Sequence, residues 1–243
     1  MKILFSPSEA KSTQSSDVSV QKENFIFPEL YEKRALILNI YDDFVKNASK
    51  DELCRLFGLK EISQGLRESI FSKGCIKAIL RYSGVAYAHL GYERLSQKAR
   101  TYIDENTLIF SNLFGVVLAS DLLPEYKLKQ GQKIDGLNIE KFYRQNFSFA
   151  VDEFLKDEVV VDLRAEFYEK FYELNQEFYT YKFIKNGKIV SHYAKAYRGK
   201  ILRELAKNGV KSKNELMSMK FDEISLVDIK KIGYKNELLF EIC

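Results

Sequence analysis

The stretch "EFYTYKFIKNGKIVSHYAKAYRGK", residues 177–200, carries the sharpest folding signal in the chain. Alternating apolar residues flank Asn186-Gly187, and a type I′ turn needs positive φ at both central positions, which Asn and Gly tolerate best. The pattern therefore predicts a two-residue β-hairpin in which Lys185 lies opposite Lys188. In this register His192 lies among aromatic side chains, as is typical of a core histidine rather than a metal ligand.

From Ala194 onward the apolar residues recur with the period of a helix. At about 100° per residue, Arg198 falls inside the apolar stripe that contains Ile201 and Leu205. A guanidinium group keeps its charge when it is buried, so Arg198 must meet a carboxylate, several carbonyl groups or a bound anion.

Two interpretations of Arg198 stay open at this point. One is a structural ion pair with Asp162 or Glu166, whose strand-to-helix segment is expected to neighbour the hairpin. The other is a cleft for phosphate that Arg198 forms with Lys195 and Lys182, where the start of the helix adds unpaired N–H donors.

Charge in this part of the chain is asymmetric. Residues 182–220 carry eleven Lys/Arg and two acidic residues, a net charge of +9, whereas the whole chain has a net charge of +4. Such a local excess is the electrostatic footprint expected of a nucleic-acid-binding surface. A lysine-rich solvated face would give the same count, so the charge alone does not decide between the two.

Composition predicts one α+β body. The 243 residues are 46% hydrophobic and 14% aromatic with 3 prolines, and no linker-like tract interrupts them, so we expect a single domain over residues 1–243. The amino-terminal apolar run is too short for a secretory or membrane segment, and we expect a cytoplasmic protein. Three cysteines without CxxC spacing and two histidines indicate no disulfide framework, metal site or cofactor.

Local patterns predict a mixed β-sheet surrounded by helices. The helix that begins after Ser49 has a capping box, because Glu52 follows three residues later. Helices are expected over residues 30–48, 49–59, 61–71, 73–84 and 139–155, and strands at 2–6, twice within 106–121, at 127–134 and at 237–243. Residues 158–174 read as a buried strand that runs into another helix.

Four stretches also resemble a known family in order and spacing. They are "FSPSEAK" (5–11), "SNLFGVVLASDLLPEYKLKQG" (111–131), "VVVDLRAEFYEKF" (159–171) and "SHYAKAYRGK" (191–200). Together they resemble the YaaA family, the bacterial peroxide stress resistance proteins, and the resemblance spans nearly the whole chain. Two departures stand out: "LASDL" lacks a basic residue after Leu118, and Lys127 replaces the usual Arg, which keeps the charge but weakens bidentate phosphate binding.

The resemblance implies an α+β domain with a helix-hairpin-helix element, which we place at residues 77–96. It also implies a positively charged cleft that binds DNA non-specifically, and a role in surviving hydrogen peroxide by limiting oxidative DNA damage and free iron. The matching motifs and the hairpin give the candidate DNA-binding residues: Ser6, Lys11, Tyr126, Lys127, Lys182, Tyr193, Lys195 and Arg198.

In this interpretation the cations contact phosphates, while Tyr126, Tyr193 and Tyr87 stack on exposed bases. The alternative is an enzyme that acts on a nucleotide or damaged base in the same cleft, with Glu166 or Asp162 beside Lys195 as an acid/base pair. An iron-sequestering protein is not favoured, because clustered His, Cys or carboxylate ligands are missing from the sequence.

Overall fold

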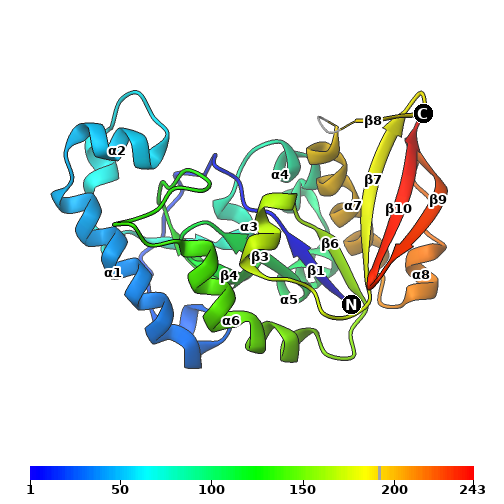
Figure 1. The fold of residues 1–243 in the computed structure, drawn as a ribbon, viewed down its shortest axis with the longest axis horizontal. Helices are drawn as coiled ribbons and strands as arrows, with labels where there is room; N and C mark the ends of the chain where they lie inside the picture. The colour runs from blue at the N-terminus through cyan, green and yellow to red at the C-terminus, as the bar shows by residue number, and fades with distance from the viewer. Residues whose placement is uncertain (191–192) are drawn as a thin grey trace.

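The computed structural model describes residues 1–190 and 193–243, and its centre is one mixed β-sheet (Figure 1). The strand order is β4-β3-β1-β6-β7-β10-β9, with β8 paired to β7. Neighbouring strands from β3 to β10 run parallel, while β4, β8 and β9 are antiparallel to their partners. The strands of this sheet are β1 (Lys2–Phe5), β3 (Thr107–Ser111), β4 (Gly115–Leu118), β6 (Val160–Leu163), β7 (Phe178–Lys185), β8 (Lys188–Ile189), β9 (Ile224–Ile232) and β10 (Lys235–Ile242).

Helices cover both faces of this sheet, which confirms the predicted α+β class. In Figure 1, α6 crosses in front of the sheet, whereas α5 and α7 lie behind it. The α-helices are α1 (Tyr31–Asn47), α2 (Lys50–Phe57), α3 (Ala78–Arg81), α4 (Val85–Leu90), α5 (Gln97–Asn106), α6 (Ile139–Leu155), α7 (Ala194–Asn208) and α8 (Lys213–Met217). Short 3-10 helices are η1 (Lys22–Asn24), η2 (Pro28–Leu30), η3 (Gln64–Arg67), η4 (Tyr92–Arg94) and η5 (Glu166–Phe171), and β2 (Cys75–Lys77) with β5 (Leu122–Pro124) forms a two-stranded sheet.

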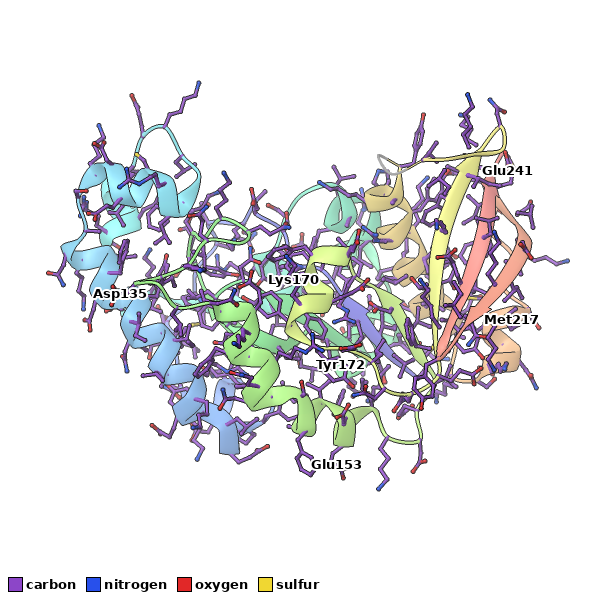
Figure 2. The ribbon with its side chains drawn as sticks, in the orientation of Figure 1. Asp135, Glu153, Lys170, Tyr172, Met217 and Glu241 are labelled. Atoms are coloured by element: carbon purple, nitrogen blue, oxygen red, sulfur yellow. The ribbon has the colours of Figure 1, made fainter. Side chains whose placement is uncertain are left out.

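The core lies between these layers. Every residue of β3 and β6 is buried, as the continuous apolar runs of a sheet covered on both faces require. Tyr172, labelled in Figure 2, is buried beside η5 and donates its hydroxyl proton to Asp152 of α6. Among the described residues, no helix is both long enough and apolar enough to cross a membrane.

The strongest local predictions are confirmed. Asn186 and Gly187 have φ values of 51° and 72°, and Lys185 pairs with Lys188 in the predicted register. Ser49 and Glu52 form the expected capping box at the start of α2. The placement of His192 lies outside the described residues.

The predicted helix over residues 61–71 is wrong apart from the short turn of η3. Asp42 of α1 accepts hydrogen bonds from the Ile70 amide at 2.8 Å and from the Ser69 hydroxyl at 2.9 Å. A tertiary acceptor therefore takes the donor that a helix would have used.

Two further segments differ from the sequence prediction. Residues 73–84 form strand β2 followed by the single turn of α3, because the Cys75 amide donates to the Val18 carbonyl at 2.7 Å and β2 pairs with β5. Residues 127–134 form no strand, and the segment after β6 is the 3-10 helix η5 rather than an α-helix.

The approach of α7 to α4 is close enough to require a glycine. A Cβ atom added at Gly199 would lie 2.0 Å from the carbonyl oxygen of Ala86. This contact is between backbones, so a rotamer change cannot relieve it. The Gly199 of the Arg-Gly motif thus sets how deeply the start of α7, with Lys195 and Arg198, sits against α4.

We predict that Gly199→Ala destabilises the protein by about 1–3 kcal/mol, although Ala is the better helix former by about 1 kcal/mol. The measurement is the free energy of unfolding from a urea titration. Gly65→Ala is the matched control, because its added Cβ meets only the Glu68 side chain at 3.9 Å. Equal stability of the Gly199 variant and wild type would show that the two helices do not depend on this contact.

Candidate functional site

A pocket of about 390 Å³ opens where the first loop, α4, β6 and α7 meet. We name it the β1–β6 pocket, because it begins at the carboxyl ends of these two strands. It brings Ser6 of the amino-terminal loop together with Lys195 and Arg198 of α7, all three of them predicted site residues. The remaining lining residues are Phe5, Pro7, Ser8, Glu9, Val85, Ala86, Tyr87, Gln130, Leu163, Ala165 and Tyr168.

Ser6 fixes the loop that forms one wall of this pocket. Its hydroxyl oxygen accepts a hydrogen bond from the Ala165 amide at 2.7 Å, and its carbonyl oxygen accepts one from the Tyr87 hydroxyl at 2.8 Å. The loop is thereby tied to both β6 and α4. The Ser6 hydroxyl keeps its own proton, which it can donate into the pocket.

Arg198 is half-buried in the pocket wall, and it makes no hydrogen bond or ion pair with any residue of the described ranges 1–190 and 193–243. Of the two interpretations of Arg198, the structural ion pair with Asp162 or Glu166 is not formed. Asp162 instead holds Arg164, with oxygen-to-nitrogen distances of 2.9 and 2.8 Å. Burial lowers the pKa of Arg198, and the charges of Asp162 and Glu169 oppose that shift from a distance.

Arg164 forms a closed unit with this aspartate. Its guanidinium also donates to the carbonyl oxygens of Tyr168 and Tyr172, and it lies 4.5 Å from the centre of the Phe110 ring. The pair is therefore fully bonded inside the protein. This explains why Asp162 is not available to Arg198 or to Lys195.

Glu166 and Lys182 lie on a second hollow that shares Arg198 with the first. This acidic pocket, about 640 Å³, is lined by five carboxylates and by four cationic side chains: Asp162, Glu166, Glu169, Glu173 and Glu237, with Arg164, Lys182, Arg198 and Lys235. Lys182 is paired with Glu237 at 3.4 Å. Glu166 is exposed and makes no ion pair with Arg198.

Lys11 and Lys127 form a third group, which contacts the same loop outside the pocket lining. Both ammonium groups donate to the carbonyl oxygen of Glu9, at 3.4 and 3.3 Å, and Lys11 also donates to that of Ser8 at 3.2 Å. The Lys11 ammonium lies 4.2 Å from the centre of the Tyr126 ring. Both lysines hold the loop, and Lys127 adds positive charge near the pocket.

The expectation that Tyr126 stacks on a base is wrong, because the side chain is only 2% exposed. Its hydroxyl lies in a buried hydrogen-bonded chain with Tyr82 and Ser111, with oxygen-to-oxygen distances of 2.8 Å. Tyr87 is also buried, at 8% exposed. Tyr193, in contrast, is 38% exposed at the start of α7, with the Lys185 ammonium 5.5 Å from its ring centre.

The helix-hairpin-helix stays a prediction. Residues 77–96 contain the single turn of α3 and the six-residue helix α4, separated by Tyr82, Ser83 and Gly84. Gly84 has a φ of 117°, and Tyr82 pairs with Lys11 in an isolated β-bridge. These features establish two short helices and a glycine turn.

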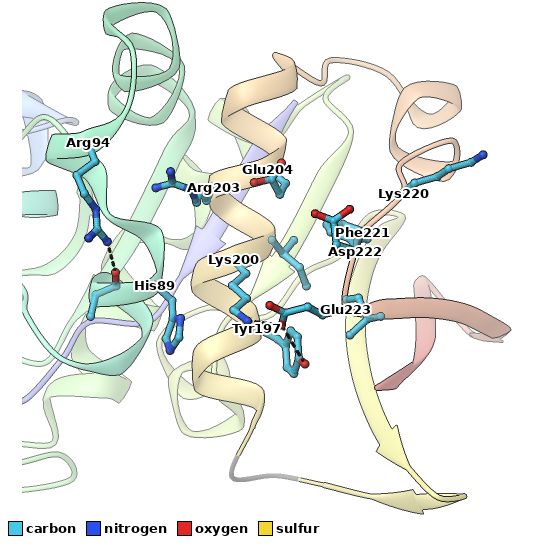
Figure 3. A pocket seen from close by; sticks show the side chains of 13 residues that line it. His89, Arg94, Tyr197, Lys200, Arg203, Glu204, Lys220, Phe221, Asp222 and Glu223 are labelled. Carbon is cyan, nitrogen blue, oxygen red and sulfur yellow. Dashed lines mark hydrogen bonds and ion pairs between the residues drawn. The ribbon is translucent and has the colours of Figure 1, made fainter. Parts of the chain in front are cut away.

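A further pocket lies between α4, α7 and residues 220–224 (Figure 3). None of the predicted site residues line it. Three of its four Lys/Arg side chains are already engaged: Lys200 pairs with Glu223, and Arg203 and Arg94 donate to carbonyl oxygens at the end of α4 at 2.9 and 3.2 Å. Lys220, the fourth, makes no hydrogen bond or ion pair with the described residues. This pocket is therefore less suited to an added anion than the β1–β6 pocket.

Four polar residues of the β1–β6 pocket were not predicted from the sequence, namely Ser8, Glu9, Gln130 and Tyr168. Each lies inside one of the matching stretches, at "FSPSEAK", "KLKQG" and "AEFYEKF". Their place inside these stretches could have indicated a role in the site. Their residue types are common on any protein surface and indicated nothing.

Lys11 provides a test that depends on pH. Burial and the neighbouring Lys127 lower the pKa of Lys11 from 10.5 to about 7. The unfolded chain therefore binds more protons than the folded protein between these values, so the contribution of Lys11 to stability rises with pH across this interval.

We predict that wild type gains stability relative to Lys11→Met as the pH rises from about 7 to 10.5. The measurement is a series of urea unfolding curves for both proteins. Lys33→Met, at an exposed position of α1, is the control and should show a constant difference. A difference between wild type and Lys11→Met that does not change with pH would contradict the lowered pKa.

Comparison with known proteins extends these observations. The family model for the peroxide stress protein YaaA matches residues 1–228. The chain is 48% identical over 244 residues to an uncharacterized protein of Campylobacter jejuni, covering 100% of this chain and 99% of the relative. It is 28% identical to a UPF0246 protein of Fusobacterium nucleatum, covering 91% of this chain and 92% of the relative. The chain therefore belongs to the peroxide stress protein YaaA family.

Proposed function

We propose that this protein serves in the peroxide stress response by binding DNA non-specifically through the β1–β6 pocket and the cations around it. One observation carries the proposal: Arg198 is half-buried at the start of α7, yet no described residue forms a hydrogen bond or ion pair with it. A partly desolvated cation of this kind favours an anion from outside. Family membership supports the peroxide-stress role.

Phosphate contacts explain why binding would be independent of sequence. Lys195 and Arg198 line the pocket, and Lys11 and Lys127 contact the Ser6–Glu9 loop outside the pocket lining. Contacts of this type position a protein on DNA without reading bases. The acidic pocket has more carboxylates than cationic side chains, which disfavours the phosphates of a DNA backbone. We therefore place the phosphates on the β1–β6 side of Arg198.

Bound protein would limit oxidative damage in two ways. It would cover part of the DNA surface, and it would release cations condensed on the phosphates that it neutralises. Ferrous ions are among the cations that such displacement removes from DNA. This displacement keeps ferrous ions away from DNA but does not lower the concentration of free iron, so the limit on free iron is proposed as a separate, indirect effect.

The size of the β1–β6 pocket supports a second candidate, an enzyme that acts on a nucleotide or damaged base. A volume of about 390 Å³ falls in the range of small-molecule sites. The acid/base pair that this alternative needs is not formed, because Asp162 is bonded to Arg164 and Glu166 makes no hydrogen bond or ion pair with Lys195. Turnover of nucleotides by wild type is the measurement that would favour this candidate.

We predict that the protein binds a random-sequence duplex in a salt-dependent manner. Arg198→Ala should weaken this binding roughly tenfold or more at low salt, because a charged hydrogen-bonding group is lost. It should also reduce the slope of log K against log salt by about 1. The measurement is fluorescence anisotropy with a labelled duplex across a salt series.

Lys33→Ala, on α1 far from α7 in Figure 1, is the matched control and should bind DNA as wild type does. Circular dichroism and thermal unfolding establish that each variant is folded. If wild type fails to bind DNA at low salt, or if both variants bind equally well, the proposed DNA-binding role is wrong.

A further inference from the structure

The β1–β6 pocket lies at the carboxyl ends of two strands from which the chain continues to opposite sides of the sheet. After β1 the next strand of this sheet is β3 on one side, whereas after β6 it is β7 on the other side. β1 and β6 are parallel neighbours, with Phe5 beside Leu163 at their carboxyl ends. In parallel sheets, small ligands bind outside the carboxyl ends of strands at such a switch point.

The dimensions of the pocket suit one nucleotide rather than a duplex. Its volume of about 390 Å³ is near the lower end for ligand sites. A DNA double helix, whose major groove alone is about 12 Å wide, cannot enter it. From a duplex that lies across the opening, only a single unpaired or extruded nucleotide can enter the pocket.

One end of the pocket is suited to a phosphate group. Lys195 and Arg198 lie one turn apart on α7 and both line the pocket. The side chain of Tyr193 makes no capping hydrogen bond to the first N–H groups of this 15-residue helix. Two cations and uncapped backbone donors are the usual partners of a phosphate.

The other walls are suited to a base. Val85, which is 53% exposed, and the partly exposed Pro7 and Ala165 give apolar surface for a flat aromatic group. Glu9 adds a polar edge: its Oε1 accepts from the Gln130 amide at 3.3 Å, and its Oε2 makes no hydrogen bond with the described residues. A carboxylate oxygen in this position can accept from the N–H groups of a base.

From these observations we infer that the β1–β6 pocket binds a single phosphorylated nucleotide. Its phosphate lies on Arg198, Lys195 and the start of α7, and its base lies between Val85 and Glu9. The inference rests on the proposed function, because the nucleotide is then an unpaired residue of the bound DNA. A free nucleoside monophosphate has the same chemistry and is the alternative ligand.

The experiment has two arms. Calorimetric titration of wild type compares the four common deoxynucleoside monophosphates with the matching nucleosides and with inorganic phosphate. Fluorescence anisotropy then compares a matched duplex with the same duplex carrying a single-nucleotide bulge. We expect at least one monophosphate to bind roughly tenfold or more tightly than its nucleoside, since the nucleoside lacks the charged contacts, and the bulged duplex to bind more tightly than the matched one.

Val85→Trp tests whether the ligand occupies this pocket. Val85 is 53% exposed at the pocket wall, so a larger ring can fill the pocket without entering the core. It should abolish binding of the monophosphate and the preference for the bulge. Val227→Trp, on the distant strand β9 and equally 53% exposed, is the control and should change neither.

The outcomes separate this inference from the proposed function. Binding to the matched duplex with no monophosphate binding and no bulge preference would overturn the inference and leave the DNA-binding role intact. Monophosphate binding without DNA binding would overturn the DNA-binding role and assign the pocket to a free nucleotide. Monophosphate binding that survives Val85→Trp would place the ligand elsewhere and overturn the inference.

Discussion

The contact between the backbones of α7 and α4 is the constraint on which the candidate site depends. Because Gly199 has no Cβ atom, the helix comes so close to Ala86 that a methyl group would overlap its carbonyl oxygen. This approach places Lys195 and Arg198 over the carboxyl ends of β1 and β6. Within the motif, Arg198 therefore supplies the positive charge, and Gly199 allows the close approach that positions it.

The arginines differ in whether their charge has hydrogen-bond or ion-pair partners inside the protein. Arg34 and Arg81 are completely buried and donate to backbone carbonyl oxygens, and Arg164 is bonded to Asp162. Arg198 is partly desolvated, but no described residue pairs with it. Since each of the other three has its bonds inside the protein, Arg198 is the arginine of this group whose environment favours an external anion.

Sequence patterns predicted those elements whose cause is local. The hairpin follows from Asn186-Gly187, and α6 follows from helical periodicity over residues 139–155. The helix expected over 61–71 fails because Asp42, distant in sequence, takes the Ile70 amide. The partner of Asp162 was missed for a related reason. It is Arg164, which follows the end of β6 and whose side chain turns back toward Asp162, and periodicity does not predict such a contact. Three of the predicted cleft residues meet in one pocket, whereas the burial of Tyr126 depends on tertiary packing that the motif does not reveal.

The most direct test of this account follows the side chain of Arg198 itself. In a nitrogen-15 NMR spectrum, its Nε–H signal, assigned by comparison with Arg198→Lys, would be recorded while a short duplex DNA is added. The account predicts that this signal shifts progressively and saturates with the DNA, while the signal of the Asp162-bound Arg164 does not move. An Arg198 signal that stays unchanged while DNA binds would show that the protein contacts DNA elsewhere, and would contradict the central claim.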